Sequence, residues 1–232
     1  MNIVITGASK GIGKAIAEQF AAGGHSLFLC SRGEASLYKT TEELLNRYPG
    51  SSIRAMPSDM SERQQIKAFA EWVISFGIPD ILVNNAGSFI PGSIHNESEG
   101  VMEEMMLLNL HSAYHTTRAF LPSMMARKSG HIFNICSIAS LNAYPNGGSY
   151  GISKYALLGF SRNLREEMKS YGIKVTAVMP GAAYTASWEG AGIDPERIMT
   201  AKDIAIMVEA ASRLSPQACV EDIILRPQLG DL

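Results

Sequence analysis

Tyr150 and Lys154 stand four residues apart in the stretch YGISK. In a helix this spacing places both side chains on one face, so a phenol and an ammonium group lie close together. A phenol has an ordinary pKa of about 10 and transfers protons poorly at neutral pH unless a nearby cation stabilises its ionised form. The pair therefore indicates general acid–base chemistry, in which Tyr150 moves a proton and Lys154 lowers the pKa of the phenol.

Two more polar residues have positions that suggest a part in such a site. Ser137 follows the apolar run at 131–135, which predicts a strand, and ligands bind at the carboxyl ends of parallel strands. Its hydroxyl could hold the oxygen of a carbonyl or an alcohol. Asn109 lies in the middle of a helical pattern, where an amide side chain competes with the backbone hydrogen bonds. From the residues alone, Asn109 predicts a bend in that helix.

The first apolar run is followed at once by the glycine-rich turn TGASKGIG, with glycines at positions 7, 11 and 13. Glycine lets the chain turn close to a pyrophosphate because no Cβ stands in the way, and the free N–H groups of the next helix then face the anion. A turn of this kind between a strand and a helix predicts a dinucleotide site. Its GxxxGxG spacing differs from the more familiar GxGxxG.

The end of the second expected strand indicates which dinucleotide binds. A site for NAD usually has an acidic residue there to accept hydrogen bonds from the adenosine ribose, whereas this chain has Ser31 and Arg32. Arg32 could instead pair with a 2′-phosphate, helped by Lys10 in the glycine turn. We therefore predict NADP(H). Two alternatives stay open: Lys10 and Arg32 are ordinary surface charges, or the nearby Glu34 selects NAD(H).

Short apolar or β-branched runs alternate with longer stretches of helical period along the chain. Strict alternation of this kind predicts a doubly wound α/β fold, with a parallel sheet and helices on both faces. No linker, repeat or low-complexity tract interrupts the pattern, so we predict a single domain over residues 1–232. The seven expected strands are residues 3–6, 26–30, 53–56, 81–83, 131–135, 174–178 and 222–225, and the expected helices include 12–22, 34–48, 61–76, 98–127 and 149–171.

The composition limits the classes of protein to which the chain can belong. Its 232 residues carry 20 basic and 22 acidic side chains, a net charge of −2, and the pI is about 6.2. Nucleic-acid and membrane-surface proteins need a basic field, so neither partner is expected. Three cysteines without CxxC spacing argue against disulfides and a zinc site. No apolar run is long enough to cross a bilayer, and we expect a cytoplasmic protein.

The order and spacing of these motifs resemble those of the short-chain dehydrogenase/reductase family. The resemblance spans nearly the whole chain and adds the NNAG run that ends at Gly87 and the PGxxxT segment from Pro180 to Thr185. It implies a Rossmann fold, hydride transfer to or from a nicotinamide, and an adenine held by Asp59 and the next backbone amide. The cofactor residues that the motifs and the resemblance together predict are Gly7, Ser9, Lys10, Gly11, Ile12, Gly13, Ser31, Arg32, Asp59, Met60, Asn85, Ala86, Gly87, Tyr150, Lys154, Pro180, Gly181 and Thr185.

The resemblance also implies a role for each of four catalytic residues. Tyr150 would be the general acid in reduction or the base in oxidation, and Lys154 would also bind the nicotinamide ribose. Ser137 would orient the carbonyl. Asn109 would bind a water molecule that links the lysine to solvent, so the bend in its helix would itself be functional.

The loops expected beside these residues are mostly apolar or aromatic and carry no committed cation. Such a lining favours a neutral ketone, aldehyde or secondary alcohol over a charged acid. The segment from Gly181 to about Thr200 is short, so we expect an open pocket. The expected pocket residues are Ser88, Phe89, Ile90, those at 141–146 and those from Tyr184 to Trp188.

We therefore predict an NADP(H)-dependent oxidoreductase that reduces a neutral carbonyl to a secondary alcohol. The chain is similar overall to 3-oxoacyl-acyl-carrier-protein reductases and sepiapterin-reductase-like members of the family. Arg127 and Lys128 could contact an acidic carrier protein, although a basic pair at a helix end also matches the helix dipole. Two alternatives are an NAD-linked alcohol or sugar dehydrogenase and a cofactor-binding regulator without catalysis.

A stripe of methionine and leucine side chains in the expected helix 98–127 is wider than one buried face requires. The helix either packs between the sheet and a neighbouring helix or also meets a second copy of the chain. The family resemblance implies a homodimer or homotetramer formed through 98–127 and 149–171. His111 and His115 on the same helix have a metal-compatible spacing but no third ligand, so we expect no metal.

Overall fold

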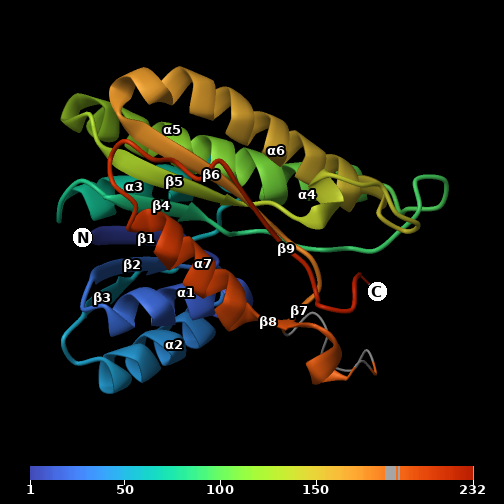
Figure 1. The fold of residues 1–232 in the computed structure, drawn as a ribbon, viewed down its shortest axis with the longest axis horizontal. Coiled ribbons are helices and arrows are strands. Elements are labelled where there is room, and N and C mark those ends of the chain that lie inside the picture. The colour runs from blue at the N-terminus through green and yellow to red at the C-terminus, as the bar shows by residue number, and fades with distance from the viewer. Residues whose placement is uncertain (186–191, 193, 232) are drawn as a thin grey trace.

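The computed structural model describes residues 1–185, 192 and 194–231. Its strands are β1 (Asn2–Thr6), β2 (Ser26–Cys30), β3 (Ser52–Ala55), β4 (Ile81–Asn84), β5 (Gly130–Ile135), β6 (Ile173–Pro180), β7 (Ala183–Tyr184), β8 (Met199–Thr200) and β9 (Asp222–Leu225). Seven of them form a parallel sheet in the order β3-β2-β1-β4-β5-β6-β9 (Figure 1). The strand order reverses between β1 and β4, so the crevice beyond their carboxyl ends is the expected place for a ligand.

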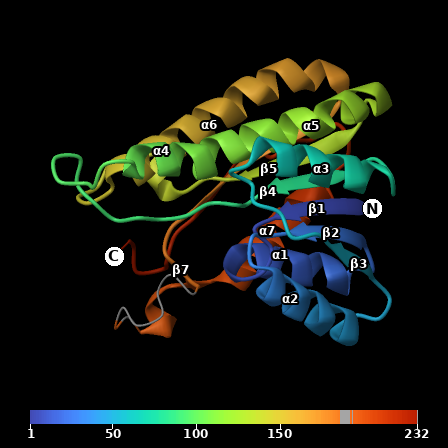
Figure 2. The same cartoon turned by 180° about the vertical axis from the view of Figure 1, so that it is seen from behind.

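Helices cover both faces of this sheet (Figures 1 and 2). They are α1 (Gly11–Ala22), α2 (Glu34–Arg47), α3 (Arg63–Ile74), α4 (Val101–Met106), α5 (Ser112–Arg127), α6 (Gly148–Met168) and α7 (Ala201–Ser212). On one face α1, α2 and α7 bury side chains such as Phe20 and Val208. On the other face α3, α5 and α6 bury side chains such as Phe69, Phe120 and Leu164. None of the helices in the described ranges is long and apolar enough to cross a membrane.

The predicted doubly wound α/β fold is confirmed. Each of the seven expected strands is present, with ends that differ from the prediction by at most two residues. The agreement has a simple cause: parallel strands covered on both faces must be apolar along their whole length, and such runs stand out in a sequence. The two-residue strands β7 and β8, which pair with each other, were not predicted because they are too short to show a period.

The prediction of one continuous helix over 98–127 is wrong. The segment contains α4, a π-helical turn over Leu107–His111 and then α5. Asn109, for which the sequence predicts a bend, lies in this turn. A π-helical turn inserts an extra residue into the helix and is found most often at functional sites. The local change in pitch turns Asn109 towards the loop that follows β4, as its contacts below demonstrate.

Candidate active site

Tyr150 and Lys154 lie on the first two turns of α6. The Lys154 side chain is buried, and its ammonium donates a hydrogen bond of 2.8 Å to the backbone carbonyl of Ile135, the last residue of β5. The same nitrogen lies 5.8 Å from the centre of the Tyr150 ring. The helical spacing therefore brings the phenol and the ammonium together at the carboxyl end of the central sheet.

Ser137 lies directly beyond β5, where the chain enters a short 3-10 turn (Ile138–Ser140). Its Oγ accepts a hydrogen bond of 3.1 Å from the N–H of Ala139, and its hydroxyl is near enough to the Tyr150 phenol to act on the pKa of that phenol. Ser140, which the sequence analysis did not single out, fixes this arrangement. Its Oγ accepts the N–H of Ser137 at 3.3 Å and donates to the Lys154 carbonyl at 2.8 Å. Ser140 thereby links the turn that carries Ser137 to α6.

Burial controls the ionisation of both groups on α6. It raises the pKa of the Tyr150 phenol to about 12, although the hydrogen bond with Ser137 acts in the opposite direction. Burial also lowers the pKa of the Lys154 ammonium to about 8. The lowering of the phenol pKa that the sequence leads us to expect from Lys154 is not seen in this structure, where desolvation of the phenol has the largest influence. At neutral pH the phenol keeps its proton, which is the form needed to protonate an oxygen.

The amide of Asn109 is buried and makes four hydrogen bonds, one of them from Nδ2 to the sulfur of Met105 at 3.8 Å. Its Oδ1 accepts the N–H of Ser88 at 2.9 Å, and its Nδ2 donates to the Ser88 carbonyl at 3.1 Å and to Oγ of Ser153 at 2.9 Å. Gly87 makes room for this approach, since a Cβ there would lie 2.7 Å from Oδ1 of Asn109. The Nδ2 group is fully engaged by these contacts, and the water predicted at Asn109 stays a prediction.

The glycine turn packs against the NNAG run. Nδ2 of Asn85 donates to the carbonyls of Thr6 at 2.9 Å and Gly7 at 3.0 Å. A Cβ at Gly13 would lie 2.4 Å from both Asn85 Nδ2 and the Gly7 carbonyl oxygen, and Gly7 itself has φ of +65°. Helix α1 begins at Gly11 with no side-chain cap and no acidic residue in its first turn. Its first N–H groups are therefore available to an anion such as a pyrophosphate.

The polar groups at the end of β2 have unused bonding capacity. The N–H of Ala8 donates to the Cys30 carbonyl at 3.0 Å, so the glycine turn lies beside this strand end. The buried Oγ of Ser31 has no hydrogen-bond partner within the described part of the chain. Lys10 and Arg32 are exposed and take part in none of the ion pairs formed by the described residues. One hydroxyl and two free cations fit the 2′-phosphate of NADP(H).

The predicted adenine residues follow β3. Asp59 accepts two hydrogen bonds through Oδ1, from the N–H of Ser61 at 2.9 Å and from its hydroxyl at 2.7 Å. Asp59 is thus a turn residue, and α3 begins at Arg63, two residues later than predicted. The adjacent Met60 is buried. Their contact with an adenine remains a prediction.

The other predicted cofactor residues lie along the same edge of the sheet. Ser9 accepts a hydrogen bond of 2.8 Å from Thr40, Ile12 packs against the core, and the N–H of Ala86 donates to Oγ1 of Thr6 at 2.9 Å. Their positions agree with a cofactor that extends from the glycine turn towards α6.

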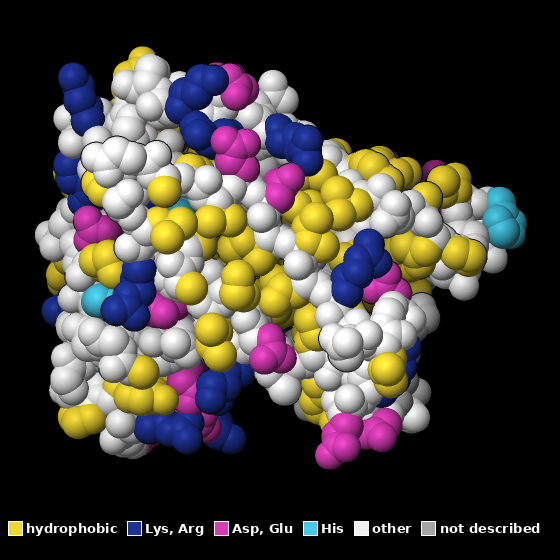
Figure 3. All heavy atoms as spheres, viewed as in Figure 1, with side chains coloured by type: hydrophobic (Ala, Val, Ile, Leu, Met, Phe, Trp, Pro, Cys, Tyr) yellow, Lys and Arg dark blue, Asp and Glu magenta, His cyan; other side chains and the backbone are white. Residues whose placement is uncertain are grey.

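The PGxxxT segment comes back over the glycine turn. Pro180 ends β6, and the N–H of Gly181 donates to the Leu225 carbonyl at 2.8 Å. A Cβ on Gly11 would lie 3.4 Å from the methyl group of Thr185. The surface is hollowed between α1 and α2 on one side and the described segment that leads into β8 on the other (Figure 3). Trp188, an expected pocket residue, lies outside the described residues.

Aromatic side chains surround the reacting centre. The ring of Phe89 contacts the Tyr150 ring edge to face, with centroids 4.8 Å apart and an interplanar angle of 80°. Phe89, Tyr144 and Tyr184 are all exposed: Phe89 and Tyr144 lie on the loops that follow β4 and β5, and Tyr184 lies in β7. Charged groups among the described pocket residues, 88–90, 141–146 and 184–185, are absent.

One contact near the site was missed by the sequence analysis. Glu97, on the loop between β4 and α4, accepts hydrogen bonds from both the N–H and the hydroxyl of Ser149, the residue before Tyr150. No motif marks Glu97, because the contact joins segments 52 residues apart. The glycines at 147 and 148 leave α6 without a capping side chain of its own. They are the one sequence signal that could have suggested a cap from another part of the chain.

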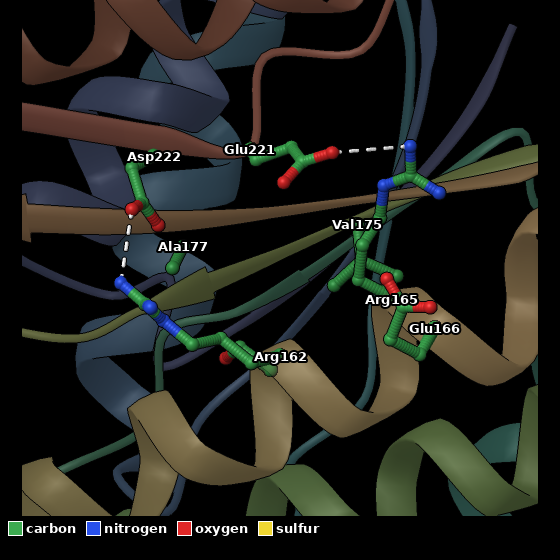
Figure 4. A pocket seen from close by; sticks show the side chains of 8 residues that line it. Arg162, Arg165, Glu166, Val175, Ala177, Glu221 and Asp222 are labelled. Carbon is green, nitrogen blue, oxygen red and sulfur yellow. Dashed lines mark hydrogen bonds and ion pairs between the residues drawn. The ribbon is translucent and has the colours of Figure 1, made fainter.

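One cavity lies away from this centre. It measures about 240 Å³ and is bounded by α6, β6 and the start of β9 (Figure 4). Ion pairs of 3.1 Å between Arg162 and Asp222 and of 3.2 Å between Arg165 and Glu221 cross it. A second cavity of about 230 Å³ between α3 and α5 is lined by basic side chains, and there His115 accepts a hydrogen bond from Arg63. Neither cavity includes a predicted cofactor residue.

The fold and the site together define a dinucleotide-binding α/β oxidoreductase. A family model described as short chain dehydrogenase matches residues 1–194. The chain belongs to the short-chain dehydrogenase/reductase family. A sepiapterin reductase of Chlorobaculum tepidum is 34% identical, and the match covers 99% of this chain and 97% of the relative.

Solved structures of the family superimpose closely on the whole chain. An alcohol dehydrogenase from the archaeon Thermococcus sibiricus, in complex with 5-hydroxy-NADP, has a TM-score of 0.90 at 30% identity, covering 98% of this chain and 96% of that one. The closed form of a serine dehydrogenase in complex with NADP+ has a TM-score of 0.89 at 28% identity, covering 100% and 97%. This chain is therefore an oxidoreductase of the same family, with relatives that contain NADP.

Proposed function

We propose that this chain is an NADP(H)-dependent carbonyl reductase that converts a neutral carbonyl to a secondary alcohol. The observation that carries the proposal is the meeting of three groups at the end of β5. The Ser137 hydroxyl is near enough to the Tyr150 phenol to act on its pKa, and the buried ammonium of Lys154 lies 5.8 Å from the centre of the phenol ring. A cluster of this composition can polarise a carbonyl and protonate its oxygen.

Each of the four residues has a defined part in the reduction. NADPH, when bound, supplies the hydride that adds to the carbonyl carbon. Ser137 donates a hydrogen bond to the carbonyl oxygen, and Tyr150 gives its proton to that oxygen as negative charge develops there. The charge of Lys154 stabilises the phenolate that remains. Water bound at Asn109 then returns a proton to the pair.

The preference for NADP(H) is supported by the groups around the end of β2. Lys10 and Arg32 supply two cations without acidic partners among the described residues, and Ser31 supplies an unpaired hydroxyl. Glu34 lies in the first turn of α2, where a carboxylate is stabilised by the helix dipole, so a role in binding a ribose is not needed to explain it. The NADP complexes of related structures agree with this choice.

The proposed substrate is an uncharged ketone or aldehyde that carries an apolar or aromatic group. The exposed ring of Phe89 offers flat apolar contact area beside the phenol, and Tyr144 and Tyr184 add two more exposed rings among the expected pocket residues. An acyl carrier protein has less support, because Arg127 is engaged within the chain. It pairs with Asp80 at 3.0 Å and donates to the carbonyl of Pro79 at 2.6 Å.

A panel of carbonyl compounds tested with NADPH and with NADH decides between the candidates. The panel includes an aryl ketone, an aliphatic ketone, an aldehyde and a keto acid, and cofactor oxidation is followed by absorbance. We expect turnover of the uncharged compounds with NADPH and at least tenfold lower kcat/KM with NADH. Faster turnover with NADH would favour the NAD-linked dehydrogenase. NADPH binding without turnover of any compound would favour a regulator.

We also propose that the chain forms one domain and assembles as a homodimer or homotetramer. A single domain is supported because β9, at 222–225, completes the sheet that β1 begins. Assembly is supported by exposed apolar side chains on the adjacent helices α4 to α6, with Glu103 and Glu104 at one end of this face and Arg118 at the other. In a twofold pair of antiparallel helices, acidic and basic ends of this kind meet. The exposed apolar side chains are Met102, Leu107, Tyr114, Ile152 and Tyr155.

The proposed compartment is the cytoplasm. Cys30, Cys136 and Cys219 are all free thiols, as a reducing compartment would leave them.

A further inference from the structure

Helix α6 is capped at its N-terminus from outside. The residue before it, Gly147, supplies no side-chain cap, so the first N–H groups of the helix need another partner. Oε1 of Glu97 accepts the N–H of Ser149 at 2.8 Å, and Oε2 accepts the Ser149 hydroxyl. These hydrogen bonds hold the pKa of the Glu97 carboxyl below its usual range. A carboxylate at this place also interacts favourably with the helix dipole.

Two glycines make the space that Glu97 occupies. A Cβ at Gly148 would lie 2.0 Å from Oε1 of Glu97 and 2.5 Å from the carbonyl oxygen of Gly92. A Cβ at Gly92 would lie 2.7 Å from Cγ of Glu97. All three distances are shorter than real Cβ contacts, so the approach of the carboxylate depends on glycine at both positions.

The loop that carries Glu97 meets the segment before α6 at further points. The N–H of Gly92 donates to the Asn146 carbonyl at 3.1 Å, and the hydroxyl of Ser93 donates to Oδ1 of Asn146 at 2.8 Å. The same loop places the ring of Phe89 against Tyr150. Tyr150 is therefore held from two sides by one loop: its ring by Phe89 and its backbone, through Ser149, by Glu97.

We propose that Glu97 is a positioning residue that sets the Tyr150 phenol against Ser137 by anchoring the first turn of α6. This inference rests on the proposed function, in which Tyr150 donates the proton. The residues at the start of a helix fray most easily, because their N–H groups lack partners within the helix. Tyr150 is in this first turn, so a loose start to α6 moves the phenol itself. A displacement of about 1 Å at a reacting group lowers the rate by as much as a hundredfold.

The kinetic test compares Glu97→Ala and Glu97→Gln with Glu99→Ala, an exposed acidic residue on the same loop. We expect kcat to fall about tenfold or more in Glu97→Ala, with the KM for NADPH and the melting temperature nearly unchanged. Glu97→Gln keeps one acceptor for the Ser149 N–H and should recover part of the loss, whereas Glu99→Ala should match the wild type. Full kcat in Glu97→Ala would overturn the inference.

A second readout does not depend on activity. Tyrosines labelled with ¹³C at Cζ give one resonance for each phenol, and Tyr150→Phe identifies that of Tyr150. Glu97→Ala should shift or broaden the Tyr150 resonance, and Glu99→Ala should leave it in place. An unchanged resonance in Glu97→Ala would contradict the positioning role. A wild-type protein without reductase activity would overturn the proposed function instead, and the resonance would still test Glu97.

Discussion

The ammonium of Lys154 lies 5.8 Å from the centre of the Tyr150 ring and donates its hydrogen bond to the carbonyl of Ile135. The lysine is thus fixed by the backbone of the central sheet, and the phenol is fixed by Ser137 and by the start of α6. The phenol and the ammonium lie on one face of α6, but different parts of the chain hold them in place. Burial sets their proton affinities, with a pKa of about 12 for the phenol and about 8 for the ammonium.

The first prediction concerns the effect of pH on reduction. Lys154 is charged below its pKa of about 8, so its support for the phenolate is lost as the pH rises through that value. We expect kcat/KM for carbonyl reduction to fall above about pH 8. Lys154→Arg keeps its charge at all accessible pH values and should lack this decline, although its rate is lower at neutral pH. An identical decline in both proteins would show that another group titrates.

The second prediction concerns the choice of cofactor. Removing Arg32 or Lys10 by substitution with Ala should raise the KM for NADPH by about tenfold to a hundredfold, because each charged contact contributes about 1.5–3 kcal/mol. The KM for NADH should change by less than about twofold, since NADH lacks the 2′-phosphate. Arg213→Ala, which removes an exposed cation at the C-terminal cap of α7 that pairs with Glu209, is the control. Equal effects on both cofactors would contradict the assignment.

The third prediction tests the packing of the glycine turn. Gly13→Ala places a Cβ 2.4 Å from Asn85 Nδ2 and from the Gly7 carbonyl oxygen, so it should lower the free energy of unfolding by about 1–3 kcal/mol and weaken NADPH binding. Gly159, on α6, has nothing within 4 Å of such a Cβ. Gly159→Ala should raise the free energy of unfolding by about 0.5–1 kcal/mol. Urea denaturation of both variants measures the difference, and equal effects would refute the packing argument.

The fourth prediction concerns stability in acid. His131 is buried, and its Nε2 lies 2.7 Å from Oγ1 of Thr176, which donates its own proton to the Val220 carbonyl at 2.6 Å. The ring must therefore donate from Nε2, and protonation would add a charge at Nδ1, which has no partner in the described chain. Burial lowers the pKa of His131 to about 3.

Because the pKa of His131 is lower in the folded chain, acid destabilises the fold. The unfolded chain binds a proton at His131 near pH 6.5 and the folded chain does not, so stability present above that pH is lost as the pH falls towards 3. The loss attributable to His131 is about 2 kcal/mol at pH 5. His131→Phe should flatten the dependence of the urea midpoint on pH, whereas the exposed His95 can be changed to Gln without effect. If the urea midpoint of His131→Phe still depended on pH as strongly as that of the wild type, other groups would be responsible for the loss of stability.

The fifth prediction concerns assembly. Leu107→Asp puts a charge into the exposed apolar face of α4 to α6 and should convert the oligomer to a species of 25.1 kDa. Leu45→Asp, on the exposed side of α2, should leave the oligomer intact. Light scattering after size exclusion measures both. A wild-type protein that is already monomeric would contradict the assembly.

The fold was predictable from the sequence because its signals are local. Apolar runs such as Ile81–Val83 mark buried parallel strands, and the glycine turn after Thr6 marks a strand-to-helix junction. The long helix was predicted wrongly because a π-helical turn does not change the apolar pattern. Only Asn109, an amide in an otherwise apolar stretch, indicates where the pitch changes.

The sequence predicted the reacting residues of the candidate site but not the residues that hold them in place. Tyr150, Lys154 and Ser137 could be chosen because their types and spacing have a chemical reason. Ser140 and Glu97 could not, since their contacts depend on how distant loops meet in space. The burial that raises the pKa of the phenol was not predicted either, because the sequence cannot give the extent of burial.

The most direct test of the central claim is the rate of NADPH-dependent carbonyl reduction by wild type and Tyr150→Phe, with NADPH binding measured in parallel by fluorescence. The substitution removes the proton donor and leaves the ring in place. We predict that kcat falls by about a hundredfold or more while the dissociation constant for NADPH changes by less than about threefold. Unchanged turnover in Tyr150→Phe, with NADPH still bound, would contradict the account.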